Sequence, residues 1–329
     1  MGSGFGDTLA ARVAARESQI VLGLDPDPEA LWPGVHDAAD TPRAEHLQRQ
    51  NAEPRQHAEQ VPTTPGDRST TRRTDHAPTW RAAVATRVHC CALIDATGPA
   101  CVAVKPQLAC FERLGAPGWE ALEAVIEHAH QRGLLVIADG KRGDIALSAR
   151  AYAQALFERL RVDLATVNPL LGGDAIEPFV TVARAAGAGV LLLVRTSNQG
   201  AADVQDLELA SGGPVWERLA AFVAEQEAAG VGEWGLSDVG AVVGATQPQH
   251  LQRARELMPR AVMLLPGVGA QGGRVEDLAP AFLPGRAGGL ITASRSIVGA
   301  HLATGGDPAE AARAEAERLR ETAWALGDR

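Results

Sequence analysis

Aromatic side chains are scarce in this sequence, whose 329 residues include only 1 Tyr, 6 Phe and 6 Trp, or 4%. Apolar residues nevertheless make up 46%, so a large core has to be built mainly from aliphatic side chains. Small and β-branched side chains suit helices that pack closely on a parallel sheet. The length fits one large α/β barrel or two ordinary domains.

Cysteine is also scarce, and its spacing argues against two common uses. The four cysteines form no CxxC pair and have no matching histidine cluster; they are Cys90, Cys91, Cys101 and Cys110. A zinc site and a disulfide framework are therefore disfavoured, and we interpret these residues as small core side chains. A basic start followed by an apolar run is missing too, so we predict a cytoplasmic protein without a signal peptide.

Long apolar runs and an excess of positive charge are missing as well. No stretch approaches the length of a membrane-spanning helix without charged residues, so we expect no membrane partner. The net charge of −9 argues against a nucleic-acid partner, which requires a basic face. A small anionic substrate needs only a local positive site, and it remains the expected partner.

One segment, residues 37–78, almost lacks large aliphatic side chains and is rich in Arg, Gln, Thr, Pro, His and Glu. Such a segment cannot bury enough surface to offset the entropy of ordering it. We interpret 37–78 as a mostly disordered polar insert after the first strand. A tolerated surface insertion is favoured over a regulatory arm.

Eight short apolar runs, separated by segments of helical pattern, predict a (β/α)8 barrel that spans residues 1–329 as a single domain. The runs are 20–24, 101–104, 134–138, 164–167, 189–194, 239–243, 261–265 and 288–292. The segment 119–132 illustrates a helix, because Leu122, Val125 and Ile126 share one face. Gly133 then offers a C-cap, and 308–324 is expected to be a closing amphipathic helix.

Polar residues follow most of these runs, at the strand ends where barrels of this kind carry their chemistry. They are Asp25, Lys105, Asp139, Lys141, Asp144, Asn168, Thr196, Ser197, Asn198, Gln271, Ser294 and Arg295. Any single one is more commonly a solvated loop residue or a helix cap. Their repetition at successive strand ends favours a functional site.

The most informative cluster follows the third run, in the sequence Asp-Gly-Lys-Arg-Gly-Asp that begins at Asp139. Asp139 and Lys141 are two residues apart and point to the same side of an extended strand end. Lys105 joins them from the adjacent strand, and Asp144 either completes an alternating row of charges or caps the next helix. Flanking carboxylates keep a lysine protonated, which favours proton donation over Schiff-base formation.

A second cluster follows the seventh and eighth runs. The glycines of 266–273 let backbone N–H groups approach a phosphate, and Arg295 can bind one with two hydrogen bonds. Loops after strands seven and eight form a recurrent phosphate site in barrels. The GxGxxG pattern at 267–272 also fits a dinucleotide-binding fold, but no acidic residue follows at the required distance. A plain turn is the remaining alternative.

Several motifs resemble orotidine 5′-phosphate decarboxylases, and most closely the bacterial branch with the longer chain, often called type 2. Lys105-Pro106-Gln107 and the segment 139–145 carry the resemblance. Further matches follow in the family's order: 22–26, 111–112, 194–198, 266–273 and 294–297. The similarity covers about residues 20–300 without the insert.

The resemblance implies roles for the charged residues. Lys141 would donate a proton to the ring carbon that loses carbon dioxide, and Asp139 would face the departing carboxylate. Lys105 would complete the charge row and contact ribose. Asp144 would reach the site of a neighbouring subunit, which implies a homodimer.

The resemblance also implies substrate contacts. Asp25 would bind ribose hydroxyls, Ser197 the pyrimidine ring, and Gln271 with Arg295 the phosphate. Two further substrate-binding positions depart from the family pattern. Ser148 stands where Thr is usual, which keeps the hydroxyl, and Ser294 stands where Gly is typical.

The implied reaction is conversion of orotidine 5′-phosphate to UMP and carbon dioxide in pyrimidine biosynthesis, with no cofactor and no metal. One alternative is a Mg²⁺-dependent phosphosugar decarboxylase or lyase on the same barrel, although Lys105 would repel a metal. A Schiff-base aldolase and a catalytically inactive UMP-binding relative are the others.

Overall fold

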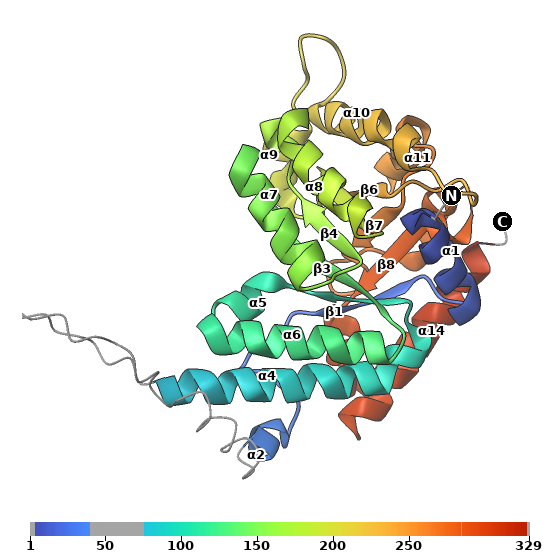
Figure 1. Cartoon of the computed structure of the whole chain (residues 1–329). Coiled ribbons are helices and arrows are strands. Elements are labelled where there is room, and N and C mark those ends of the chain that lie inside the picture. Colours follow the sequence, from blue (N-terminus) through green and yellow to red (C-terminus); the bar gives the residue numbers. More distant parts are fainter. Residues whose placement is uncertain (1–3, 40–75, 284, 328–329) are drawn as a thin grey trace, which may run out of the picture.

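The computed structural model describes residues 4–39, 76–283 and 285–327. In this part of the chain eight parallel strands close into a barrel in sequence order, with helices around it (Figure 1). The strands are β1 (Ile20–Leu24), β2 (Ala103–Pro106), β3 (Leu135–Arg142), β4 (Leu164–Val167), β5 (Gly189–Arg195), β6 (Val239–Val243), β7 (Met263–Pro266) and β8 (Gly289–Ala293). The predicted (β/α)8 barrel is therefore confirmed.

Each predicted apolar run overlaps one strand, and the largest difference at a strand end is in β3. This strand continues to Arg142, four residues beyond its expected end at Ala138. Its extension pairs with β4, because Arg142 lies opposite Val167 after an irregularity in the register. The extension matters for the site, since it carries Asp139 and Lys141 on the strand itself.

The helices connect and cover the strands. The longer ones are α1 (Phe5–Arg16), α4 (His76–Thr97), α6 (Gly115–Gln131), α7 (Ala146–Gln154), α8 (Gly173–Ala185), α10 (Val215–Glu227), α11 (Gln249–Leu257) and α14 (Pro308–Leu326). The shorter ones are α2 (Val35–Ala39), α5 (Leu108–Glu112), α9 (Ala202–Gln205), α12 (Arg295–Val298) and α13 (Ala300–Thr304). Single turns and short irregular helices are η1 (Gly98–Ala100), η2 (Ala155–Arg159), η3 (Pro169–Leu171), η4 (Gln199–Ala201), η5 (Ala228–Gly230), η6 (Val275–Phe282) and η7 (Arg286–Gly288).

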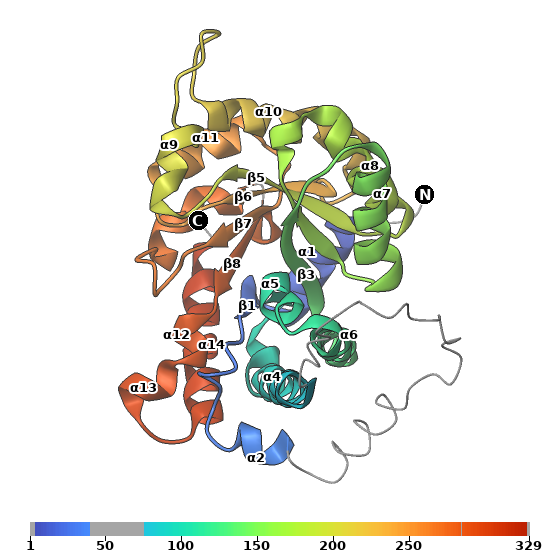
Figure 2. The ribbon, with the colours of Figure 1, turned by 90° about the vertical axis from the view of Figure 1, so that its left-hand side faces the viewer.

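Both helices expected from the sequence are present. α6 contains 119–131, buries the predicted apolar face and is followed by Gly133 with a φ of +70°. α14 begins after Asp307, whose side chain caps it by accepting a hydrogen bond from the Glu310 amide at 2.9 Å. α4 lies against both α6 and α14 (Figures 1 and 2).

Two apolar layers hold the barrel together. One lies between strands and helices, and the other fills the barrel interior with alternate strand residues such as Val21, Ile137 and Leu264. Phe5 and Leu9 of α1 belong to the interior layer, so α1 closes the end of the barrel at the amino ends of the strands. The opposite end, at the carboxyl ends, is left for polar side chains.

The expected insert 37–78 falls mostly outside the described residues, at 40–75. Its two ends are helical, because 37–39 belong to α2 and 76–78 to α4. All four cysteines are free; Cys90 and Cys101 are buried, and Cys91 and Cys110 are partly buried. Among the described helices none is long and apolar enough to cross a membrane.

Candidate active site

A cavity of about 610 Å³ opens at the carboxyl ends of the strands. Parallel strands bring all their carboxyl ends to one rim, so residues far apart in the chain meet there. Of the ten residues to which the family resemblance gives a role, eight line this cavity: Asp25, Lys105, Asp139, Lys141, Ser197, Gln271, Ser294 and Arg295. Asp144 and Ser148 do not.

A row of alternating charges forms one wall of the cavity. Lys105 Nζ lies 3.9 Å from Asp25 Oδ1 and 2.6 Å from Asp139 Oδ2. Lys141 Nζ lies 2.7 Å from Asp139 Oδ1. The row follows the strand order β1, β2, β3, in which Gly23 of β1 pairs with Lys105 of β2. Two carboxylates and two ammonium groups therefore balance each other along the wall.

Asp139 is the fixed point of this row. Its Oδ1 accepts hydrogen bonds from Lys141 and from the Thr166 hydroxyl at 3.0 Å, and its Oδ2 accepts one from Lys105. Gln107 Nε2 also donates to Asp139 Oδ2, at 3.4 Å. Burial alone would raise the pKa of Asp139, but the ammonium groups of Lys105 and Lys141 outweigh it and lower the pKa to about 2. Asp139 is thus a permanent anion near neutral pH.

The two lysines differ in their surroundings. The Lys105 side chain is 6% exposed, whereas that of Lys141 is 45% exposed. Burial would lower the pKa of Lys105, but Asp139 and Asp25 raise it above its ordinary value, so this lysine stays charged inside the wall. Lys141 is the ammonium group that is open to the cavity.

The backbone of Lys141 is unusual, with a φ of +47°. A residue with a side chain rarely adopts this left-handed conformation, which has to be stabilised by its surroundings. Here the Lys141 amide donates to the Thr166 hydroxyl at 2.9 Å, and the Asn168 amide donates to the Arg142 carbonyl at 2.7 Å. These contacts with β4 and its end fix the direction in which Lys141 leaves the strand.

Thr166 and Thr292 are site residues that the sequence did not single out. Thr166 holds both Asp139 and the Lys141 amide, yet it lies within an apolar run. Thr292 lines the cavity, is 6% exposed, and its hydroxyl has no hydrogen-bond partner among the described residues. Both lie within predicted strands. A polar residue within an otherwise apolar strand was the sequence feature that could have indicated them as site residues.

The loops after β7 and β8 form the opposite side of the cavity. Gly267, Gly269 and Gly272 all have positive φ, and a Cβ on Gly269 would lie 3.0 Å from the Ser296 hydroxyl. The two loops therefore touch, and Gln271 and Arg295 both line the cavity there. Arg295 is exposed and forms no ion pair with any residue that the structure describes. This side can receive an anion such as phosphate.

The same arrangement decides against the dinucleotide-binding interpretation of the glycine motif. That fold needs the motif in the first turn of an open sheet, whereas 267–272 follows β7 of a closed barrel.

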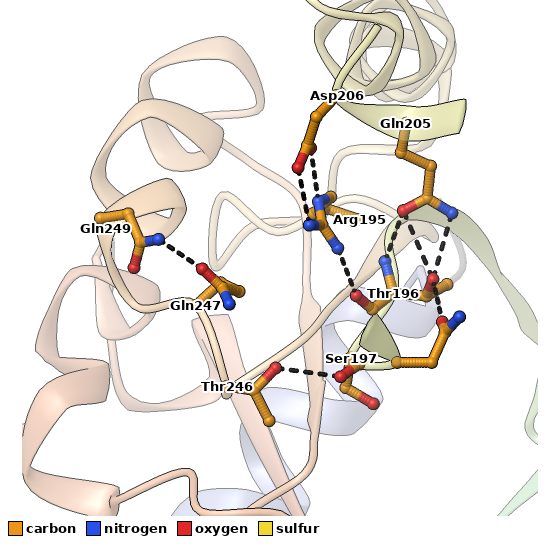
Figure 3. Close-up of polar contacts among 9 residues, drawn as sticks. Arg195, Thr196, Ser197, Gln205, Asp206, Thr246, Gln247 and Gln249 are labelled. Atoms are coloured by element: carbon orange, nitrogen blue, oxygen red, sulfur yellow. Dashed lines mark hydrogen bonds and ion pairs between the residues drawn. The ribbon is translucent and has the colours of Figure 1, made fainter. Parts of the chain in front are cut away.

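The loop after β5 supplies a third part of the wall. Thr196, Ser197 and Asn198 line the cavity, and the Ser197 carbonyl accepts a hydrogen bond from the Thr246 hydroxyl at 3.1 Å (Figure 3). Gly244 permits this close approach, because a Cβ there would lie 2.7 Å from Ser197 Cα.

Asp144 lies outside the cavity of its own chain. Its carboxylate accepts a hydrogen bond from the Ile145 amide at 2.8 Å and pairs with no cation in the described part of the chain. It does not cap α7, whose first turn receives no side-chain hydrogen bond. Within one chain, Asp25 rather than Asp144 is the fourth member of the charge row. Ser148 is exposed on α7.

The donor set at the row does not resemble a metal centre. Within 4–39, 76–283 and 285–327, no group of three or more His, Cys, Asp or Glu side chains is arranged to hold a metal ion. At the row itself, the carboxylates of Asp25 and Asp139 are separated by the Lys105 ammonium group.

A closed parallel barrel with fixed charges at β1–β3, and with glycine-rich loops and an exposed arginine at β7–β8, is the layout of barrel proteins that bind phosphorylated small molecules. The comparisons identify the family within this class. Residues 82–314 match the model of the orotidine 5′-phosphate decarboxylase / HUMPS family. This chain belongs to that family.

Individual relatives agree with the family match. A Halobacterium salinarum protein named orotidine 5′-phosphate decarboxylase is 37% identical over 322 residues, which cover 96% of this chain and 99% of the relative. A Deinococcus radiodurans protein of the same name is 47% identical over 207 residues, covering 62% and 74%. The solved structure of Leishmania donovani OMP decarboxylase has a TM-score of 0.68 at 30% identity, with 99% and 100% coverage.

Proposed function

We propose that this chain decarboxylates orotidine 5′-phosphate to UMP and carbon dioxide, the step that yields UMP in pyrimidine biosynthesis. The observation that carries the proposal is the Asp25–Lys105–Asp139–Lys141 row, which faces an anion-binding side across one cavity. The names of the relatives agree with this activity.

In this proposal, the loops after β7 and β8 hold the phosphate through Gln271, Arg295 and backbone amides. Ser294 adds a hydroxyl beside them. Asp25 and Lys105 then contact the ribose, and Ser197 hydrogen-bonds the pyrimidine ring. Binding energy from the phosphate places the ring carbon that bears the carboxylate beside Lys141.

The reaction breaks the bond between the ring carbon and the carboxylate. Carbon dioxide leaves, and the bonding electron pair stays on the ring carbon. Lys141 donates its proton to that carbon, which gives UMP, and the neutral amine regains a proton from solvent. The fixed ammonium stabilises charge that develops only in the transition state, which is how it accelerates the step. Asp139 faces the departing carboxylate and holds Lys141 in place.

An absorbance assay with orotidine 5′-phosphate, run with and without EDTA, tests this proposal. We expect turnover that EDTA does not reduce. Loss of activity in EDTA and its recovery with Mg²⁺ would support a metal-dependent lyase of the same barrel type instead. Calorimetry that shows UMP binding without turnover would support an inactive relative, and trapping of substrate by borohydride would support a Schiff-base aldolase.

We further propose that the enzyme is a homodimer in which Asp144 serves the partner's site. An exposed apolar patch, here defined as Ile145, Leu147, Leu170 and Leu171, adjoins Asp144; its members are between 52% and 80% exposed. The segment that carries Ile145 and Leu147 lies beside the one that carries Leu170 and Leu171. Gly143 and Asn168, which precede the two pairs, are so close that a Cβ on Gly143 would lie 3.1 Å from the Asn168 carbonyl oxygen. Large apolar side chains exposed in one region are typical of an interface, and a twofold axis would repeat them on both subunits.

Heterodimers of Lys141→Ala and Asp144→Ala subunits, isolated through two different affinity tags, test the shared site. Each parent homodimer lacks one residue at both sites, whereas the heterodimer has one site with both residues intact. We expect two inactive parents and a heterodimer with about half the wild-type turnover. A heterodimer no more active than its parents would refute sharing, and a monomer in analytical ultracentrifugation would refute the dimer.

We also propose that the protein works in a reducing compartment, the cytoplasm, because its four cysteines are free. The acidic net charge of −9 agrees with a small-molecule partner rather than a nucleic acid.

A further inference from the structure

One wall of the cavity is a short irregular segment, Thr196–Asn198, between the end of β5 and η4. Such a segment lacks the repeated hydrogen bonds that fix a strand or a helix, so its position depends on side chains elsewhere. Figure 3 shows that a network of polar contacts behind the wall supplies them. None of the outer members of this network, Arg195, Gln205, Asp206 and Thr246, lines the cavity.

Arg195 and Asp206 form the centre of the network. Arg195 is the last residue of β5, and its side chain is only 5% exposed. Its Nε donates to Asp206 Oδ1 at 2.8 Å and its Nη2 to Asp206 Oδ2 at 2.9 Å. Its Nη1 donates to the Thr196 carbonyl at 2.7 Å. One guanidinium group therefore ties the wall to the loop between α9 and α10, which projects from the barrel (Figure 1).

Gln205 and Thr246 fix the same wall from two other directions. Gln205, the last residue of α9, accepts from the Thr196 amide at 2.9 Å and also hydrogen-bonds the Thr196 hydroxyl. Thr246, after β6, donates to the Ser197 carbonyl at 3.1 Å. The Gly244 amide donates to the Arg195 carbonyl at 2.7 Å. The backbone of Thr196 and Ser197 is thus held by three side chains, those of Arg195, Gln205 and Thr246.

We propose that Arg195 and Asp206 are positioning residues that set the wall of the cavity against the pyrimidine ring, and so determine affinity for the ring but not for the phosphate. This inference rests on the proposed function, in which Ser197 contacts the ring. A two-bonded pair between charged groups is both strong and directional, so it resists displacement of the wall. The phosphate side lies on β7 and β8, which this pair does not touch.

Asp206→Asn tests the proposal, because it removes the charge and one acceptor from a side chain that is 34% exposed and whose replacement leaves the core intact. The measured quantities are the dissociation constants of UMP and of ribose 5-phosphate, which lacks the ring. We expect UMP to bind about tenfold more weakly and ribose 5-phosphate within about twofold of wild type. Asp206→Glu, which keeps the charge, should recover most of the loss.

Two further variants separate positioning from general stability. Glu217→Gln breaks a pair of the same geometry, Arg253–Glu217 at 3.0 and 3.1 Å, between α10 and α11 and away from the cavity. It should leave both dissociation constants unchanged. Thr246→Val removes the hydroxyl that holds the Ser197 carbonyl and should weaken UMP binding selectively, as Asp206→Asn does.

The outcomes are distinct. Unchanged UMP affinity in Asp206→Asn, or an equal loss for UMP and ribose 5-phosphate, would overturn the positioning role. If the wild-type protein turns over orotidine 5′-phosphate, the proposed function stands even when the positioning role is overturned. A wild-type protein that neither binds UMP nor turns over the substrate would instead refute the proposed function.

Discussion

The two lysines of the charge row have different environments, so their removal should affect stability and activity differently. Lys105 is enclosed between Asp25 and Asp139, and its side chain is 6% exposed. Lys141 reaches Asp139 from the open side and is 45% exposed. Substituting either one by alanine removes an ammonium group from the row. Only the loss of Lys105 leaves a buried carboxylate without its enclosed partner.

The size of the difference follows from burial. Breaking a buried ion pair by removing one partner costs about 3–5 kcal/mol in general. Asp139 keeps Lys141, Thr166 and Gln107 when Lys105 is lost, so we expect the lower end, about 3 kcal/mol, for Lys105→Ala. A half-exposed pair contributes about 1 kcal/mol or less, so Lys141→Ala should change the free energy of unfolding little. Both variants should lack measurable turnover.

Urea unfolding at neutral pH and the orotidine 5′-phosphate assay measure the two effects, and calorimetry with UMP measures binding. Lys141→Ala should remain folded and retain part of its UMP affinity, because the phosphate side is untouched. Equal destabilisation by the two substitutions would refute the distinction between an enclosed and an open lysine. Substantial decarboxylation by Lys141→Ala would refute its role as the proton donor.

Three further predictions concern other residues. Burial raises the pKa of Glu227 from its ordinary 4.5 to about 7, so the contribution of Glu227 to the free energy of unfolding should be largest below pH 4.5 and fall by up to about 3 kcal/mol as pH rises from 4.5 to above 7. Urea unfolding of Glu227→Gln should lack this fall. Thr166→Val should lower kcat about tenfold and leave UMP affinity unchanged, because it removes one hydrogen bond to Asp139 and the one that the Lys141 amide donates. Arg295→Ala should weaken the binding of UMP and of ribose 5-phosphate alike in calorimetry, about 100-fold. A loss of affinity for UMP alone would contradict the proposal that Arg295 holds the phosphate.

The strands could be predicted because alternate burial inside and outside a closed barrel makes them continuous apolar runs. The end of β3 could not, because Asp139 and Lys141 interrupt the apolar pattern while the backbone continues to pair with β4. The spacing of Asp139 and Lys141 did indicate a shared face. It gave no sign of the left-handed backbone at Lys141, which depends on Thr166 of the next strand.

The charge row shows a second limit of prediction from the sequence. Sequence order places Asp144 beside Lys141, and so made it the expected fourth charge. Within one chain the fourth charge is Asp25, at the other end of the row, because β1 pairs with β2 and brings Asp25 to 3.9 Å from Lys105. Partners that meet only through strand pairing cannot be found by counting along the chain. Arg195 lies in the matching segment 194–198, but the sequence does not indicate its role, since its partner Asp206 lies eleven residues away across a loop.

The order of the strands around the barrel also explains how one cavity can select a nucleotide. β8 is the neighbour of β1, and Ser294 approaches Gly23 so closely that a Cβ on Gly23 would lie 2.6 Å from Ser294 Cβ. In the proposed function, a ligand whose phosphate lies at Arg295 therefore meets Asp25 first and Lys141 further on, in the order phosphate, ribose, reactive carbon. The charge row alone would accept many phosphosugars. Under the same proposal, only the wall after β5 contacts the ring, so we expect substrate choice to depend on Thr196–Asn198 and on the Arg195–Asp206 pair behind it.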